Sequence, residues 1–98
     1  MSNQVILINA FKVPDGKLQE SIEYWETHRD FMKSQPGYIS TKLHQSILTE
    51  ATFQLVNVAI WESQDAFYTA AQKMRQELSH VQVEGLSGDP ALYHVVRE

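Results

Sequence analysis

The sequence predicts an α+β fold: a ferredoxin-like βαββαβ domain with a four-stranded antiparallel sheet and both helices on one face. Two patterns support this prediction. Four segments have the alternating or continuously apolar character of strands, and two segments repeat apolar residues at the spacing of an amphipathic helix. Turn residues separate these segments without a linker or a repeat, so residues 1–98 are expected to form a single domain.

The first strand and the first helix are predicted from the N-terminal third of the chain. Residues 4–13 have strand character and end at the Pro-Asp-Gly break of residues 14–16. Asp15 or a near neighbour is the expected N-cap of the helix that follows. The Pro-Gly pair at residues 36–37 ends that helix. Its stripe at helical spacing comprises Leu18, Ile22, Trp25, Arg29 and Met32.

A hairpin, a second helix and a last strand follow. Residues 38–47 and 52–61 are predicted to be strands. Ser63 is a natural N-cap for the second helix, because its hydroxyl can accept a bond from a free backbone N–H. Residues 80–89 are expected to form a loop or a short extra helix, and the last strand is predicted over residues 91–97, after a proline. The apolar stripe of the second helix comprises Phe67, Ala70, Ala71, Met74 and Leu78.

The sheet face opposite the helices is expected to be bare and yet apolar. It would carry Ile6 and Ile8 of the first strand and Val56, Val58 and Ile60 of the third. A bare apolar face of that size is typical of an interface. We therefore expect a homodimer in which two sheets face each other and form a dimeric α/β barrel.

The third strand carries the most informative pair of side chains. Asn57 and Trp61 share one face of this apolar strand and are separated there only by the small Ala59. A buried carboxamide without a partner costs roughly 1–3 kcal/mol, so Asn57 must either find internal partners or meet a ligand. The pair therefore indicates either the floor of a pocket or an internally satisfied Asn beside a core Trp.

Composition argues against several classes of function. The chain has no cysteine, which excludes thiolate chemistry and fits a cytoplasmic location. The formal net charge is −4 and the basic residues are scattered, so we expect no nucleic-acid partner. No segment reaches the roughly 20 apolar residues of a membrane span. The four histidines lack the spacing of a metal motif, so no metal site is expected.

Three sequence elements resemble one known family. They are Pro-Gly-Tyr at residues 36–38, Asn-Val-Ala-Ile-Trp-Glu-Ser at 57–63 with Ala-Phe at 66–67, and Pro-Ala-Leu-Tyr at 90–93. Together they span essentially the whole chain and are similar to the antibiotic biosynthesis monooxygenase (ABM) superfamily. The resemblance implies a small dimeric α+β barrel. It is less specific for activity, because members of the superfamily include oxygenases and small-molecule isomerases.

One group in this superfamily oxidises aromatic polyketides without a metal or flavin, because the deprotonated substrate reduces oxygen itself. The resemblance implies that Asn57 and Trp61 hold the substrate and the developing peroxide in a pocket between the sheet and the helices. A dry cavity with a few fixed hydrogen-bond donors suits that chemistry. The sequence departs from this group in its helix Arg and Tyr, for which Arg75 and Tyr68 lie only nearby.

A second group degrades haem, with an Asn on the first strand, a Trp on the second helix and a His ligand at the end of that helix. Asn9 matches the first position and His80 falls near the third. Thr69 or Ala70 stands where the Trp is expected. Because the first and third strands are neighbours in this fold, Asn9 and Asn57 could line one cavity.

The preferred hypothesis is a cofactor-independent monooxygenase that oxidises a small aromatic or quinol-like substrate with O₂. His80 would transfer protons or, alternatively, only interact with the dipole of the second helix. The alternatives for the whole protein are a non-catalytic small-molecule-binding or stress-response dimer, and a haem-degrading monooxygenase. The candidate catalytic residues are Asn57, Trp61 and His80, and the candidate substrate-binding residues are Asn9, Tyr24, His28, Phe31 and Phe67.

Overall fold

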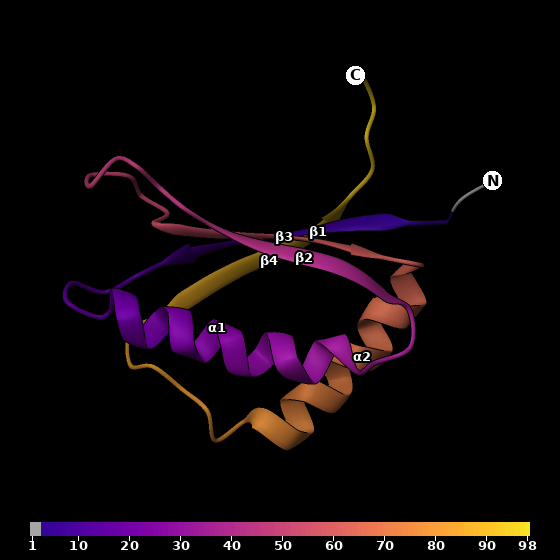
Figure 1. Cartoon of the computed structure of the whole chain (residues 1–98), viewed down its shortest axis with the longest axis horizontal. Coiled ribbons are helices and arrows are strands. Elements are labelled where there is room, and N and C mark those ends of the chain that lie inside the picture. The colour runs from indigo at the N-terminus through magenta and orange to yellow at the C-terminus, as the bar shows by residue number, and fades with distance from the viewer. Residues whose placement is uncertain (1–2) are drawn as a thin grey trace.

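A computed structural model describes residues 3–98 as one layer of strands and one layer of helices (Figure 1). The four strands form a single antiparallel sheet in the order β2-β3-β1-β4. Both helices lie against one face of the sheet, and the other face is uncovered. The ferredoxin-like fold predicted from the sequence is therefore confirmed. The elements are β1 Val5–Lys12, α1 Leu18–Lys33, β2 Tyr38–Gln45, β3 Leu55–Trp61, α2 Gln64–Leu78 and β4 Ser87–Tyr93.

The two central strands point their side chains as the alternation predicts. Residues of β3 alternate strictly between buried and half-buried along the strand. Asn57 belongs to the buried set, which faces the helices. Asn9 of β1 is paired directly with Asn57. Because paired residues of neighbouring strands point to the same face, both carboxamides project toward the helices.

The two helix starts differ in how they are capped. Ser63 caps α2 as predicted, because its Oγ accepts the backbone N–H of Ala66 at 3.1 Å. The prediction for α1 holds in position only: its N-cap is Lys17, a near neighbour of Asp15, and no side-chain hydrogen bond caps that end. The backbone N–H of Lys17 donates to the carbonyl of Pro14 at 3.1 Å. That turn contains Asp15 and therefore keeps it outside the helix.

The last strand begins earlier and ends earlier than the sequence predicts. Pro90 lies within β4 rather than before it, and residues 80–86 contain no helix. A proline is tolerated there because β4 is an edge strand, paired with β1 alone, and needs no N–H on its free side. The strand stops at Tyr93, opposite Ile6, one residue short of the start of β1 at Val5.

Gly37 lies where the chain enters β2 and passes close to α2. Its φ is +89°, and a Cβ built on it would lie 2.4 Å from the Cβ of Ala66. Its carbonyl also accepts the backbone N–H of Glu62 at 2.8 Å. Both the left-handed backbone and the missing side chain are therefore required at this position.

We expect Gly37→Ala to lower the free energy of unfolding by about 2–5 kcal/mol, the sum of left-handed strain and overpacking. Gly16→Ala is the matched control, because Gly16 has a φ of +77° but nothing within 4 Å of its Cβ position. The control should lose only about 1–2 kcal/mol. Urea unfolding followed by circular dichroism measures both changes. Equal losses in the two variants would show that the contact with Ala66 has no energetic role.

Candidate functional site

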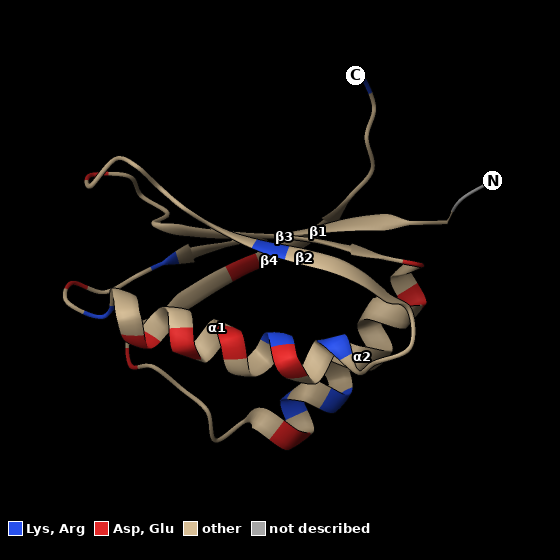
Figure 2. Ribbon diagram, viewed as in Figure 1, with Lys and Arg blue, Asp and Glu red and all other residues tan. Residues whose placement is uncertain are grey.

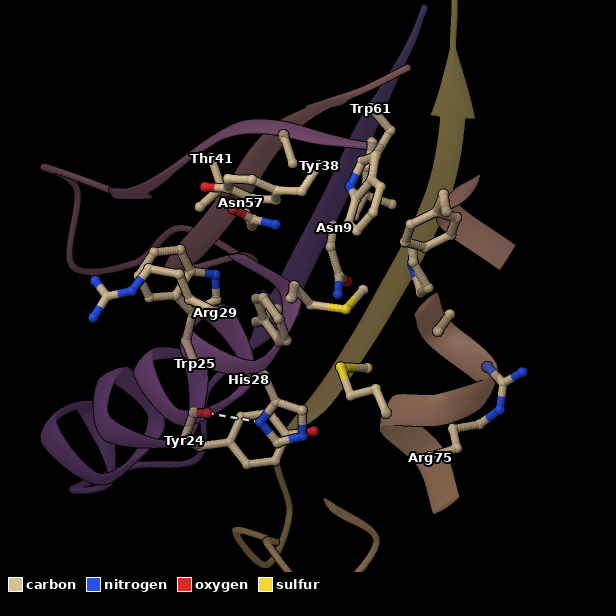
Figure 3. Close-up of a pocket in the computed structure, with 18 residues that line it drawn as sticks. Asn9, Tyr24, Trp25, His28, Arg29, Tyr38, Thr41, Asn57, Trp61 and Arg75 are labelled. Carbon is tan, nitrogen blue, oxygen red and sulfur yellow. Dashed lines mark hydrogen bonds between the residues drawn. The ribbon is translucent and has the colours of Figure 1, made fainter. Parts of the chain in front are cut away.

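A cavity of about 170 Å³ lies between the sheet and the two helices (Figure 3). All four strands and both helices contribute residues to its wall, which is mainly apolar and aromatic. A cavity of about 150 Å³ is known to accommodate benzene. The space therefore suits a ligand of about one aromatic ring with small substituents.

Asn57 is held in place by the neighbouring strand β2. The hydroxyl of Thr41 donates to Asn57 Oδ1 at 2.5 Å, and Asn57 is 8% exposed. Because the oxygen is engaged on this side, the amide nitrogen is directed away from Thr41, and Figure 3 shows it pointing into the cavity. The two alternatives left open by the sequence are therefore combined. Asn57 is satisfied internally through its oxygen and still presents N–H donors to a ligand.

Asn9 lies beside Asn57 but lacks such a partner. Its Oδ1 is buried and forms no hydrogen bond within the described part of the chain. Gly88 of β4 makes room for this side chain, because a Cβ there would lie 2.8 Å from Asn9 Oδ1. An unpaired buried carbonyl oxygen is costly. Asn9 would therefore gain a hydrogen bond by turning its oxygen toward a donor on a ligand.

Trp61 closes one end of the cavity. Its indole is almost fully buried, and the rings of Tyr38 and Phe67 contact it edge to face at centroid distances of 5.7 and 5.6 Å. Such contacts hold an aromatic ring in one orientation. Figure 3 shows the nitrogen of the indole directed to the side of the cavity that holds Asn57 and Tyr38. Trp61 thus serves the core and the cavity wall together.

The α1 wall of the cavity brings together an imidazole and a phenol. Nδ1 of His28 lies 2.8 Å from the backbone carbonyl oxygen of Tyr24, and the two rings stack at a centroid distance of 4.1 Å. Burial raises the pKa of the Tyr24 hydroxyl above its usual value, because it disfavours the phenolate. Tyr24 therefore stays protonated in any neutral-pH chemistry.

The charged residues that line the cavity are two arginines. Arg29 of α1 contacts Asp30 at 3.1 Å and lies over the ring of Trp25, 5.1 Å from its centroid. Arg75 of α2 is an exposed residue of the cavity wall. Among residues 3–98 no Asp or Glu lines the cavity, although the whole chain has a net charge of −4. The local charge therefore favours a ligand that is anionic or becomes anionic.

Six of the eight residues predicted from the sequence line this cavity, and two do not. Phe31 lies at the edge of the α1 face that carries Tyr24 and His28, three residues after His28, but its side chain does not reach the cavity wall. His80 follows the end of α2 at Leu78 and is exposed. The structure therefore does not place His80 for contact with a ligand in this cavity. The six that line it are Asn9, Tyr24, His28, Asn57, Trp61 and Phe67.

Residues 3–98 bear on two further expectations, a metal site and a membrane-spanning helix. In this range no three or more His, Cys, Asp or Glu side chains are grouped so that they could hold a metal ion. None of the helices in the same range is long and apolar enough to cross a membrane.

Comparison with known proteins identifies a family model and several similar solved structures. The model described as antibiotic biosynthesis monooxygenase matches residues 4–80. A candidate monooxygenase from Shewanella loihica PV-4 is 64% identical, with coverage of 100% of this chain and 99% of that chain and a TM-score of 0.93. A comparison with curated proteins finds no match for this chain.

Two more distant structures share the fold. SnoaB, a cofactor-independent oxygenase from Streptomyces nogalater, is 20% identical, with coverage of 99% of this chain and 97% of that chain and a TM-score of 0.75. The heme-degrader MhuD from Mycobacterium tuberculosis, with two hemes bound, is 21% identical, with coverage of 96% and 97% and a TM-score of 0.74. At such low identity these structures establish the fold alone.

Proposed function

This chain belongs to the antibiotic biosynthesis monooxygenase family, and from that premise we propose that it oxidises a small phenolic or quinol-like compound with O₂, without a bound cofactor. One observation carries the proposal. Two carboxamides, Asn9 and Asn57, project side by side into a mainly apolar cavity, and one of them is held with its N–H groups inward. The lack of cysteine supports a cytoplasmic location for this activity.

The proposed reaction needs no external reductant. The phenol loses its hydroxyl proton, and an electron-rich ring carbon of the anion then adds O₂ to form a peroxide. Loss of water from the peroxide leaves a quinone, so one phenol and one O₂ yield one quinone and one water. The Asn57 N–H groups would stabilise the charge that develops on the peroxide oxygen. The apolar wall would exclude water from the reacting anion.

The size of the cavity bears on the choice of substrate. A volume of about 170 Å³ suits one ring better than a polycyclic anthrone or a haem. Haem degradation gains no support from the residues either. His80 is outside the cavity, and no Trp occupies positions 69 or 70, where Thr69 is exposed and Ala70 is packed in the core.

Oxygen uptake by metal-stripped protein tests the proposed function. We expect consumption of one O₂ per quinone formed, fastest with monocyclic phenols or hydroquinones, slower with naphthoquinols and slowest with anthrones. A Clark electrode measures the O₂ consumed, and absorbance measures the quinone formed in the same sample. Failure to turn over any of these compounds would contradict the proposal. Saturable binding without a product would then favour the non-catalytic binding dimer.

Thr41→Val should lower kcat about 10-fold, because it keeps the shape of the side chain but removes the hydrogen bond that orients Asn57. Thr41→Ser retains the hydroxyl and is expected to stay close to the wild type. Steady-state kinetics with the best phenol compares the two variants, and thermal melting checks that both are folded. Equal kcat values for the Val and Ser variants would show that this hydrogen bond does not matter for turnover.

The uncovered sheet face supports a homodimer as the working form of the enzyme. Its centre carries half-buried apolar residues of β1 and β3. Charged residues in the strands occur only at the margins: Lys42 on β2, Asp89 on β4 and Lys12 at the end of β1 (Figure 2). An apolar centre with a charged rim is typical of a protein interface. A second copy of this chain would cover the face.

A further inference from the structure

The imidazole of His28 lies in the cavity wall, and one of its two nitrogens already contacts the backbone. Nδ1 lies 2.8 Å from the backbone carbonyl oxygen of Tyr24. A carbonyl oxygen can only accept, so Nδ1 carries the hydrogen in this contact. In a neutral imidazole the other nitrogen, Nε2, then holds a lone pair. The backbone of α1 thus selects the tautomer whose free nitrogen is a base.

The ring of His28 is also held in position. It stacks against Tyr24 with an interplanar angle of 35°, and Figure 3 shows the two rings together on the α1 side of the cavity. Both residues belong to a 16-residue helix, so the ring is carried by a rigid element rather than by a loop. A base that is held in one tautomer and one orientation is prepared for proton transfer.

We infer that His28 accepts the hydroxyl proton of the phenolic substrate, an assignment that rests on the oxygenase function proposed above and deepens it. The O–H bond of the substrate breaks, and its electron pair stays on the oxygen as phenolate. A new N–H bond forms at Nε2, which makes the imidazole an imidazolium. The step consumes no oxidant, and it generates the anion that then reduces O₂.

The groups around His28 suit this transfer. The titratable or charged residues that share the cavity with it are Tyr24 and Arg29 of α1, Tyr38 of β2 and Arg75 of α2. None of them is a carboxylate, so no acidic side chain competes for the proton. The phenolate that forms stabilises the imidazolium, because the two opposite charges lie side by side.

Ionisation of a bound phenol in the absence of oxygen tests the inference. The probe is para-nitrophenol, whose phenolate is yellow, mixed with the protein under nitrogen about one pH unit below the midpoint of the free dye. We expect the wild type to bind mainly the yellow phenolate. In His28→Gln the ratio of bound phenolate to bound phenol should fall at least about 10-fold. His94→Gln, in the exposed C-terminal segment, is the matched control and should behave as the wild type.

Oxygen uptake provides the second measurement. His28→Gln should lower the rate of oxygen uptake about 10²-fold with substrates that are neutral at the assay pH. The rate should fall far less with substrates that are already phenolates. If the Gln variant is unstable, His28→Phe keeps the stacking on Tyr24 and replaces it in both assays. Equal ionisation of the dye by wild type and the His28 variants overturns the inference, as does binding of the neutral phenol by the wild type. Loss of ionisation in His80→Gln instead would assign the proton transfer to His80.

The two proposals can fail separately. The wild type could bind phenolate, and His28→Gln lose it, while no phenol supports oxygen uptake. That result would support His28 as the base and contradict the oxygenase function. If His28→Gln takes up oxygen with neutral phenols as fast as the wild type, the oxygenase function is supported and the role of His28 as the base is contradicted.

Discussion

Asn57→Ala is expected to lower kcat/KM for phenolic substrates about 10²–10³-fold, the loss typical when one donor to a developing oxyanion is removed. The Asn57 amide nitrogen points into the cavity because Thr41 holds its oxygen on the opposite side. Alanine removes that donor and leaves space that no other side chain fills. The loss should fall mainly on kcat, since the bond strengthens as charge moves to the peroxide.

A double-mutant cycle sharpens this prediction. Thr41 acts only through Asn57 in our interpretation, so adding Thr41→Val to Asn57→Ala should cause almost no further loss of activity. Additive losses would mean that Thr41 contacts the substrate in its own right. If Asn57→Ala instead raises KM and leaves kcat unchanged, Asn57 binds the substrate without stabilising the peroxide.

The position of Asn57 could be predicted from the sequence because strand alternation has a strict period of two. That period places Asn57 and Trp61 on one face, and the βαββαβ order puts the first and third strands side by side. From these two facts we predict that Asn9 and Asn57 can line one cavity, and both residues line it. Their direct pairing depends on the register of the two strands, which only the structure gives. Strand alternation is therefore sufficient to place these side chains on the helix-facing side of the sheet.

The inward position of Tyr38 could not be predicted in the same way. Alternation predicts Ile39 and Thr41 on one face of β2, but an irregularity between Tyr38 and Ser40 shifts the register. Such a shift depends on tertiary packing rather than on local pattern. It places Tyr38 and Thr41 together in the cavity wall and leaves Ile39 exposed.

His80 shows a different limit of sequence reasoning. A shift of one or two residues at a helix end decides whether the next side chain faces the core or the solvent, and helix ends are the boundaries that pattern predicts least well. α2 ends at Leu78, and His80 lies in the exposed turn beyond it. His28, within the regular part of α1, is the imidazole that lines the cavity.

Ile8→Asp is expected to turn the proposed dimer into a monomer, with a dissociation constant raised about 10²–10³-fold by an unpaired buried carboxylate. Ile8 lies on β1 at the centre of the uncovered face, opposite Val58 on one side and Ala91 on the other. Neither neighbour can neutralise the new charge. Val58→Asp would be a weaker choice, because Lys42 lies directly opposite Val58 and could pair with the carboxylate.

Sedimentation velocity over a series of protein concentrations measures the dissociation constant. Thr69→Asp is the control, since it adds the same charge to an exposed position of α2 and should leave the dimer intact. The cavity lies on the helix side of the sheet, away from this face, so the Ile8→Asp monomer should still bind phenols and ionise the nitrophenol probe. A wild type that sediments as a monomer, or an Ile8→Asp variant with an unchanged dissociation constant, would show that this sheet face is not the dimer interface.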